Sequence, residues 1–96
     1  MATVIHGDFE WEADKASTNR RKHAVSFEEA TTIFADPNYV LTADAEEAQR
    51  FLALGMSGVL RLLLVVHVER GRRIRLISAR KATNHEARTY EKRRFT

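Results

Sequence analysis

The alternation of apolar and polar side chains predicts five strands. Residues 9–11 alternate apolar and acidic side chains, as in a short strand with one wet face. Residues 39–42 form a short run of mostly β-favouring types. Three longer apolar stretches, joined by turn signals, predict strands over residues 50–56, 59–68 and 73–79. Consecutive strands joined by short turns form an antiparallel meander.

Two helices are predicted between the first two strands. Asp14 is of a type that caps helices, and it predicts a helix ending near Lys22. Ser26 and Glu29 have the spacing of a capping box, in which each side chain bonds the backbone amide of the other residue. We therefore expect a second helix over residues 27–34, ended by the proline that follows.

The C-terminal region predicts a third helix. Thr83 and Glu86 repeat the capping-box spacing and begin a helix that extends to about Arg93. Together the elements predict a single α+β domain over residues 1–96. Its antiparallel sheet, a meander, has the two N-terminal helices on one face and the C-terminal helix at its edge or end.

Alternation divides the side chains of the strand predicted over residues 59–68 between the two faces of the sheet. Leu62, Leu64 and Val66 share the face that we expect to be buried against the helices. Arg61 and His67 lie on the other face, which we expect to be half-exposed and suited to a functional surface. Whether Arg75 or Arg80 shares the face of His67 depends on strand register, which the sequence does not determine.

Charge is distributed unevenly along the 96 residues. Residues 1–48 carry four basic and ten acidic side chains, a net of −6, and residues 49–96 carry twelve basic and three acidic ones, a net of +9. Ten of those twelve are arginine, which favours bidentate recognition of phosphate or carboxylate. The second half is therefore predicted to meet an anionic partner. The alternative is a solvated arginine-rich strand face without a function.

Several classes of protein are excluded by what the sequence lacks. The chain has no cysteine, which excludes disulfide frameworks and thiol nucleophiles. It has no apolar run of membrane-spanning length and no signal-peptide pattern, so we expect a cytoplasmic protein that does not contact the membrane. The histidines are scattered and no glycine-rich phosphate loop is present, so we expect no metal and no cofactor.

The predicted strands contain three candidate functional side chains. His67 has a side chain whose usual pKa suits acid–base chemistry near neutral pH. The alternative is a half-buried histidine satisfied by a neighbour. Arg50 begins a strand and Arg80 ends one, and element ends are common places for binding groups. The cation at Lys22 is accounted for by the dipole of its helix.

Motifs in both halves resemble the BrnT toxins. Residues 11–19 and 22–30 are similar to the family opening W-D-x-x-K-x-x-x-N…K-H-G-V-S-F-E-E-A. The similarity extends from Phe9 to about Arg93 and continues through residues 50–55, 61–67 and 77–83 and through Glu86, Arg88 and Tyr90.

This resemblance implies a bacterial type II toxin with a RelE-like fold and ribonuclease activity. It implies a cognate BrnA-type antitoxin as partner, in a heterotetramer or other hetero-oligomer. The resemblance also implies that DNA is contacted only through the antitoxin, which would supply the DNA-binding part of a complex that represses its own operon.

The mechanism expected for such a toxin is metal-independent attack of an RNA 2′-hydroxyl on the adjacent phosphate, which needs a base, a cation and an acid. We assign Arg80 and Arg50 to the phosphate and His67 to acid or base catalysis. Lys22 and Tyr90 are additional catalytic candidates. The predicted RNA-binding residues are Arg61, Arg73, Arg75 and Lys81. The alternative function is a non-catalytic module of the same fold that holds an antitoxin or nucleic acid through its basic sheet.

Three positions depart from the family pattern. Glu12 replaces an aspartate and is expected to alter only a helix cap. Ala24 replaces a glycine and is expected to strain or shift the turn between the first two helices. Gln49 stands where the family often has an acidic residue, so a general base at that position would be lost here.

Overall fold

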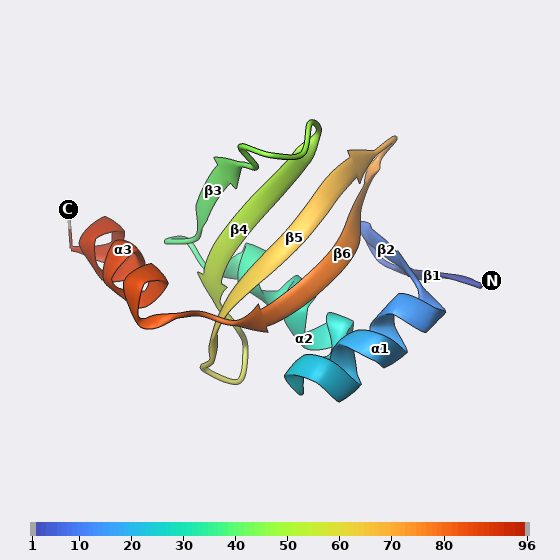
Figure 1. Ribbon diagram of the computed structural model, residues 1–96, viewed down its shortest axis with the longest axis horizontal. Coiled ribbons are helices and arrows are strands. Elements are labelled where there is room, and N and C mark those ends of the chain that lie inside the picture. Colours follow the sequence, from blue (N-terminus) through green and yellow to red (C-terminus); the bar gives the residue numbers. More distant parts are fainter. Residues whose placement is uncertain (1, 96) are drawn as a thin grey trace.

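A six-stranded sheet organises residues 2–95, the part of the chain that the computed structural model describes (Figure 1). Its strands lie in the order β1-β2-β6-β5-β4-β3. Helices pack on the sheet without alternating regularly with its strands, so the predicted α+β class is confirmed. The strands are β1 (Thr3–His6), β2 (Phe9–Glu12), β3 (Val40–Ala43), β4 (Arg50–Met56), β5 (Leu62–Arg70) and β6 (Arg73–Lys81).

The three longest strands, β4, β5 and β6, form the predicted antiparallel meander. The connection between β4 and β5 is longer than predicted, because β5 begins at Leu62. The Ser57 amide donates to the Arg61 carbonyl at 2.8 Å and closes a loop between the strands. Within that loop Leu60 has φ +65°, a left-handed conformation outside the extended region of regular strands.

The sheet as a whole is mixed, so the prediction of an antiparallel sheet is wrong. β2 runs parallel to β6, with Phe9 opposite Ile74 and Glu10 opposite Arg75. A parallel pair needs a long crossover connection, and the chain between β2 and β6 supplies it. β1 was not predicted; it pairs antiparallel with β2 across a turn where Gly7 has φ +60°.

The helices are α1 (Ala13–His23), α2 (Phe27–Thr31) and α3 (Asn84–Arg94), with a 3₁₀ turn η1 (Thr32–Ala35) continuing α2. The second predicted helix is therefore in place, but its second half is 3₁₀. Asp14 is not the cap of α1. Glu12 occupies that position without a side-chain capping bond, and Asp14 lies in the first turn, where its charge favours the helix dipole.

The two predicted capping boxes differ. At α3 the box is complete: the Glu86 amide donates to Thr83 Oγ1 at 3.1 Å, and the Thr83 amide donates to Glu86 Oε1 at 2.9 Å. At α2 only half of the box forms, because the Glu29 amide donates to Ser26 Oγ at 3.0 Å while the Glu29 carboxylate bonds elsewhere. The α2 prediction is therefore correct in position and wrong in bonding.

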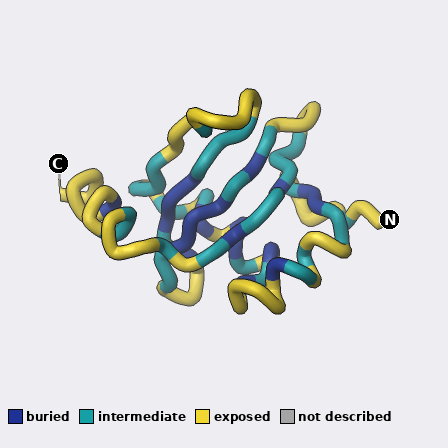
Figure 2. Tube along the Cα trace, in the orientation of Figure 1, coloured by how far each residue is buried: buried dark blue, intermediate teal, exposed yellow. Residues whose placement is uncertain are grey.

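One face of the sheet, the covered face, packs against α1, α2 and η1. Its core includes Trp11, Phe27 and Ile33, with Leu63 and Val65 of β5 fully buried beneath them. Figure 2 shows buried positions along the central strands, whereas the loops and most of α3 are exposed. The predicted burial of β5 was therefore assigned to the wrong face. Both faces of this strand are apolar, so alternation alone could not identify the one that the helices cover.

The other face is covered only at one end, by α3. Tyr90 of α3 packs there against Leu54 and Leu64. We call the remainder of this side the open face. Strand pairing and alternation assign to it Arg50, Leu52, Val66, Val68, Arg73, Arg75, Ser78 and Arg80.

Candidate functional site

Strand register brings Arg50 and Arg75 into one row on the open face. Both pair with Val68 of β5, Arg50 from β4 and Arg75 from β6. Two strand spacings put their Cα atoms about 10 Å apart. Arg73 lies two residues before Arg75, on the same face of β6. It pairs with Arg70 at the end of the β5–β6 hairpin. The result is a cluster of arginine residues at this end of the open face.

The two arginines of the row differ in their bonding. The Arg75 guanidinium donates to Glu10 Oε2, and both side chains are largely buried. Arg50 makes no side-chain hydrogen bond or ion pair within residues 2–95 and is half-buried. Arg75 is therefore held in a fixed position, whereas the donors of Arg50 are available to a bound anion.

Arg80 lies at the α3 end of the open face and is held by Glu86. Its Nη1 and Nη2 atoms donate to the two carboxylate oxygens at 2.8 and 3.0 Å. This bidentate bond raises the pKa of Arg80 and lowers the pKa of Glu86. Arg80 pairs with Leu64, four residues along β5 from Val68, which is about 13 Å from the row of Arg50. The predicted phosphate ligands thus share a face but are not adjacent.

His67 lies on the covered face, and the prediction of a half-exposed position is wrong. Its side chain stacks on Phe51 at 5.8 Å between ring centroids and meets Phe34 edge-on at 5.2 Å. The residue is 3% exposed, and burial lowers its pKa. The sheet separates this imidazole from Arg50 and Arg80, so the structure does not bring together the three residues assigned to catalysis.

The other two catalytic candidates have different surroundings. Tyr90 is buried, and its hydroxyl donates to Asp36 Oδ2 at 2.7 Å, which fastens α3 to the end of η1. Burial and the Asp36 carboxylate raise the pKa of Tyr90 to about 12. Lys22 is exposed on α1 and lines a groove whose other wall includes Ser78 of β6. Lys22 therefore reaches the edge of the open face, whereas Tyr90 has a bonding role inside the protein.

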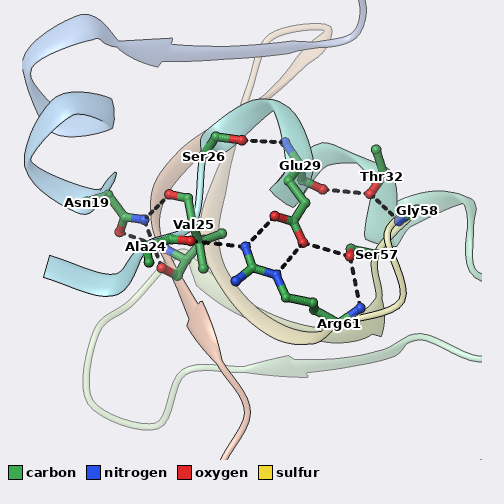
Figure 3. Close-up of polar contacts among 10 residues, drawn as sticks. Asn19, Ala24, Val25, Ser26, Glu29, Thr32, Ser57, Gly58 and Arg61 are labelled. Atoms are coloured by element: carbon green, nitrogen blue, oxygen red, sulfur yellow. Dashed lines mark hydrogen bonds and ion pairs between the residues drawn. The ribbon is translucent and has the colours of Figure 1, made fainter. Parts of the chain in front are cut away.

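Arg61, predicted to bind RNA, is bonded within the protein (Figure 3). Its guanidinium forms a bidentate pair with the Glu29 carboxylate, with Nε donating at 2.9 Å, and Nη2 also donates to the Ala24 carbonyl at 3.0 Å. Ser57 Oγ donates to the same carboxylate at 2.8 Å. Hydrogen bonding by Arg61 holds the pKa of Glu29 below its usual range. This arrangement fastens the β4–β5 loop to the first two helices.

The remaining RNA-binding candidates lie on different faces of the sheet. Arg73 and Arg75 lie beside Arg50, whereas Lys81 pairs with Leu63 on the covered side and ends β6. The sequence pattern missed Glu10 as the partner of Arg75, because their contact depends on the parallel pairing of β2 with β6. Within residues 2–95, no group of three histidine or acidic side chains is arranged to hold a metal ion.

Two family departures have visible consequences. Ala24 ends α1 with φ 56°, the left-handed conformation that glycine adopts more readily than alanine, so strain at this turn stays a prediction. Gln49 also has a positive φ, 70°, and is exposed next to Arg50.

Comparison with known proteins shows the family of this chain and a solved structure of similar fold. A family model described as "Ribonuclease toxin, BrnT, of type II toxin-antitoxin system" matches residues 11–86. The chain belongs to the BrnT family. The crystal structure of the ribonuclease toxin BrnT from Brucella abortus is similar in fold, with a TM-score of 0.64 and 23% identity over 77% of this chain and 94% of that one. A comparison with curated proteins finds no match.

Membership of this family implies an antitoxin as partner. None of the helices within residues 2–95 has both the length and the apolar character needed to span a membrane.

Proposed function

We propose that this chain is an endoribonuclease toxin and that its open face binds the RNA substrate. The observation that carries the proposal is the row of Arg50 and Arg75 on a sheet face that α1 and α2 leave uncovered. Its location in a chain of the ribonuclease toxin family gives these arginines a substrate of matching charge. The RelE-like details of the architecture stay a prediction.

The arginines suit the charge that develops during attack by the 2′-hydroxyl. The phosphorane intermediate gains negative charge on its equatorial oxygens, and guanidinium donors held in place stabilise it. Arg50 has donors free for this contact, while Glu10 and Glu86 hold Arg75 and Arg80 in fixed orientations. We therefore retain Arg50 as a ligand of the reacting phosphate and add Arg75, while Arg80, about 13 Å from their row, is assigned to another phosphate of the same RNA strand.

The proton-transfer role requires a revised assignment. His67 and Tyr90 are buried away from the row, so neither reaches a phosphate bound there. Lys22 lies across a groove from Ser78 and remains a candidate at the edge of the open face. We propose that the reaction proceeds without a metal ion, because 2′-hydroxyl attack requires a base, an acid and a cation, and side chains can supply all three.

The test is cleavage of labelled RNA by the purified chain in EDTA, with and without ribosomes. Arg50→Ala is expected to lower the rate about 10²-fold, by analogy with the loss of one transition-state donor. Arg20→Ala, an exposed arginine of α1, is the matched control and should leave the rate unchanged. A rate for Arg50→Ala equal to that of the wild type would show that the row is not the substrate site.

A second function, RNA or antitoxin binding without catalysis, is favoured by one observation. The sheet separates His67 from the arginines that were expected to work with it. Binding of labelled RNA by anisotropy, with no cleavage under any of the conditions above, would identify the chain as a binding module.

The partner and its setting complete the proposal. We propose a BrnA-type antitoxin that forms a heterotetramer or other hetero-oligomer with this chain in the cytoplasm and makes the DNA contacts. Co-expression of the two chains followed by light scattering measures the stoichiometry. Operator binding by this chain alone would contradict the assignment of DNA contacts to the antitoxin.

A further inference from the structure

A pocket of about 290 Å³ opens beside the β5–β6 hairpin on the covered face. Aromatic and aliphatic side chains from η1, β3 and β6 form most of its wall, and His67 belongs to the lining. Charged residues of the hairpin complete it. The lining residues used below are Phe34, Tyr39, Leu41, His67, Arg72 and Arg73, and the carboxylate of Glu69 also lines the pocket.

The imidazole of His67 lacks hydrogen-bond partners. Both ring nitrogens are shielded from solvent, and neither has a partner within residues 2–95. Buried polar atoms are nearly always bonded, and leaving one unpaired is destabilising. Phe34 and Phe51 hold the ring through aromatic contacts that offer no bonding group. Because both nitrogens are closed to solvent, a ligand in the pocket would bond to them only after the ring turns toward it.

We propose that this pocket holds one unstacked nucleobase of the bound RNA. The base would pack against Phe34 and Tyr39, and its polar edge would hydrogen-bond to the imidazole of His67 once that ring turns toward the pocket. Proteins recognise single-stranded RNA in this way, by stacking bases on aromatic rings and bonding their edges. A neutral imidazole offers one donor and one acceptor, and each nucleobase edge offers both. This inference rests on the proposed function, because it assumes that the chain binds RNA.

The position of the pocket matches the proposed path of the RNA backbone. Arg73 belongs both to the pocket lining and to the cluster around Arg50 and Arg75. A strand whose phosphates contact that cluster would reach the pocket around the hairpin, with Arg72 beside it. The volume is slightly below the range of about 300–1,000 Å³ typical of small-molecule sites, which suits a base rather than a larger ligand.

The experiment compares two uncleavable oligonucleotides of equal length by fluorescence anisotropy with the full chain. One is a 2′-O-methyl RNA with all its bases, and the other has the same backbone but no bases. The wild type is expected to bind the first roughly tenfold more tightly, the effect of one stacked base. Equal affinities would overturn the pocket proposal and leave the proposed function standing. No binding of either oligonucleotide would overturn both.

Three variants test the location. Leu41→Trp fills the mouth of the pocket, since Leu41 is 50% exposed there. His67→Phe keeps an aromatic ring but removes both nitrogens. Ile5→Trp, a similarly exposed position on β1, is the matched control. The first two variants are expected to lose the tenfold preference for the base-bearing strand, and Ile5→Trp to keep it. Retention of the preference by all three would place the base elsewhere.

A spectroscopic measurement separates a direct contact from an indirect effect. The ring ¹⁵N signals of His67, assigned by their absence from His67→Phe, should move when the base-bearing oligonucleotide is added and stay in place with the abasic one. Signals of His67 that do not respond to either oligonucleotide would overturn the contact.

Discussion

Asn19 and Ala79 bond to each other as two strand residues would. Asn19 Nδ2 donates to the Ala79 carbonyl at 2.8 Å, and the Ala79 amide donates to Asn19 Oδ1 at 3.0 Å. The same side chain also donates to the Val25 carbonyl at 3.0 Å. β2 pairs with β6 only at residues 74 and 75. Asn19 therefore bonds the backbone amide and carbonyl of β6 at a residue that β2 does not reach. One buried amide side chain thus joins α1, the α1–α2 turn and the edge of the sheet.

Replacing Asn19 is expected to destabilise the fold. Asn19→Ala leaves the buried amide and carbonyl of Ala79 unpaired and should lower the free energy of unfolding by about 3 kcal/mol. Urea denaturation measures the loss. Ser17→Ala, an exposed change on the same helix, is the control and should alter stability by less than about 0.5 kcal/mol. A loss at Asn19 as small as that of the control would contradict the bonding described.

Replacing Ala24 by glycine is expected to stabilise the protein. Ala24 has φ 56°, where the methyl group is strained and glycine is not. Ala24→Gly should raise the free energy of unfolding by about 1 kcal/mol, seen as a higher thermal midpoint. Ala35→Gly, made where φ is not positive, should instead lower it. A lower midpoint for Ala24→Gly would mean that the turn is not strained.

Stability is expected to fall in mild acid because of His67. Burial lowers the pKa of this imidazole in the folded protein, while the unfolded chain titrates near 6.5. The unfolded state therefore binds the proton first. The free energy of unfolding therefore falls as the pH drops below about 6.5, the pKa in the unfolded chain. It stops falling once the pH is below the pKa of His67 in the folded protein. Glu69 attracts the proton and opposes this effect, but burial is the larger cause.

The measurement is the urea midpoint between pH 5 and pH 8. His67→Phe should flatten the decline in this window, and His85→Gln, an exposed histidine of α3, should retain it. Glu29 and Glu86 have lowered pKa values, and the stability they contribute is lost only at lower pH, as they protonate. A decline that is the same in His67→Phe and in the wild type would assign it to other groups.

Arg61 and Arg73 are expected to have opposite roles. Arg61→Ala leaves the Glu29 carboxylate, with its side chain 14% exposed, without its cation and should lower stability by about 2 kcal/mol. Arg61→Lys should restore only part of this loss, because one ammonium cannot form the bidentate pair. Arg73→Ala should leave stability nearly unchanged but weaken RNA binding. Denaturation and anisotropy on both variants measure the two effects, and a reversed pattern would refute these roles.

Much of the fold was predictable because it depends on local patterns. The meander of β4, β5 and β6 followed from apolar runs separated by turn residues, and α3 from the spacing of Thr83 and Glu86. The parallel contact of β2 was not predictable, because its partner β6 lies far along the chain. β1 was missed although its partner β2 follows it directly across the turn at Gly7. A special backbone conformation at the end of α1 was foreseeable, because Ala24 stands where a helix end and the family pattern favour glycine.

The candidate site was predictable in composition but not in arrangement. The excess of arginine in the second half indicated an anionic partner, and Arg50, Arg73 and Arg75 do gather on one face. The pairing of Arg61 with Glu29 and of Arg75 with Glu10 could not be foreseen, because each joins elements that are distant in sequence. Which arginines are free and which are bonded depends on these contacts.

The sequence by itself determined the family, the central strands and the sign of the charge on them, since motifs, alternation and composition are properties of the chain in one dimension. Tertiary structure decided which face of β5 the helices cover, and with it the location of His67 on the side opposite Arg50 and Arg80. The physical reason is that both faces of a central strand are apolar. Only the packing of Trp11, Phe27 and Ile33 against one of them distinguishes the core from the open face.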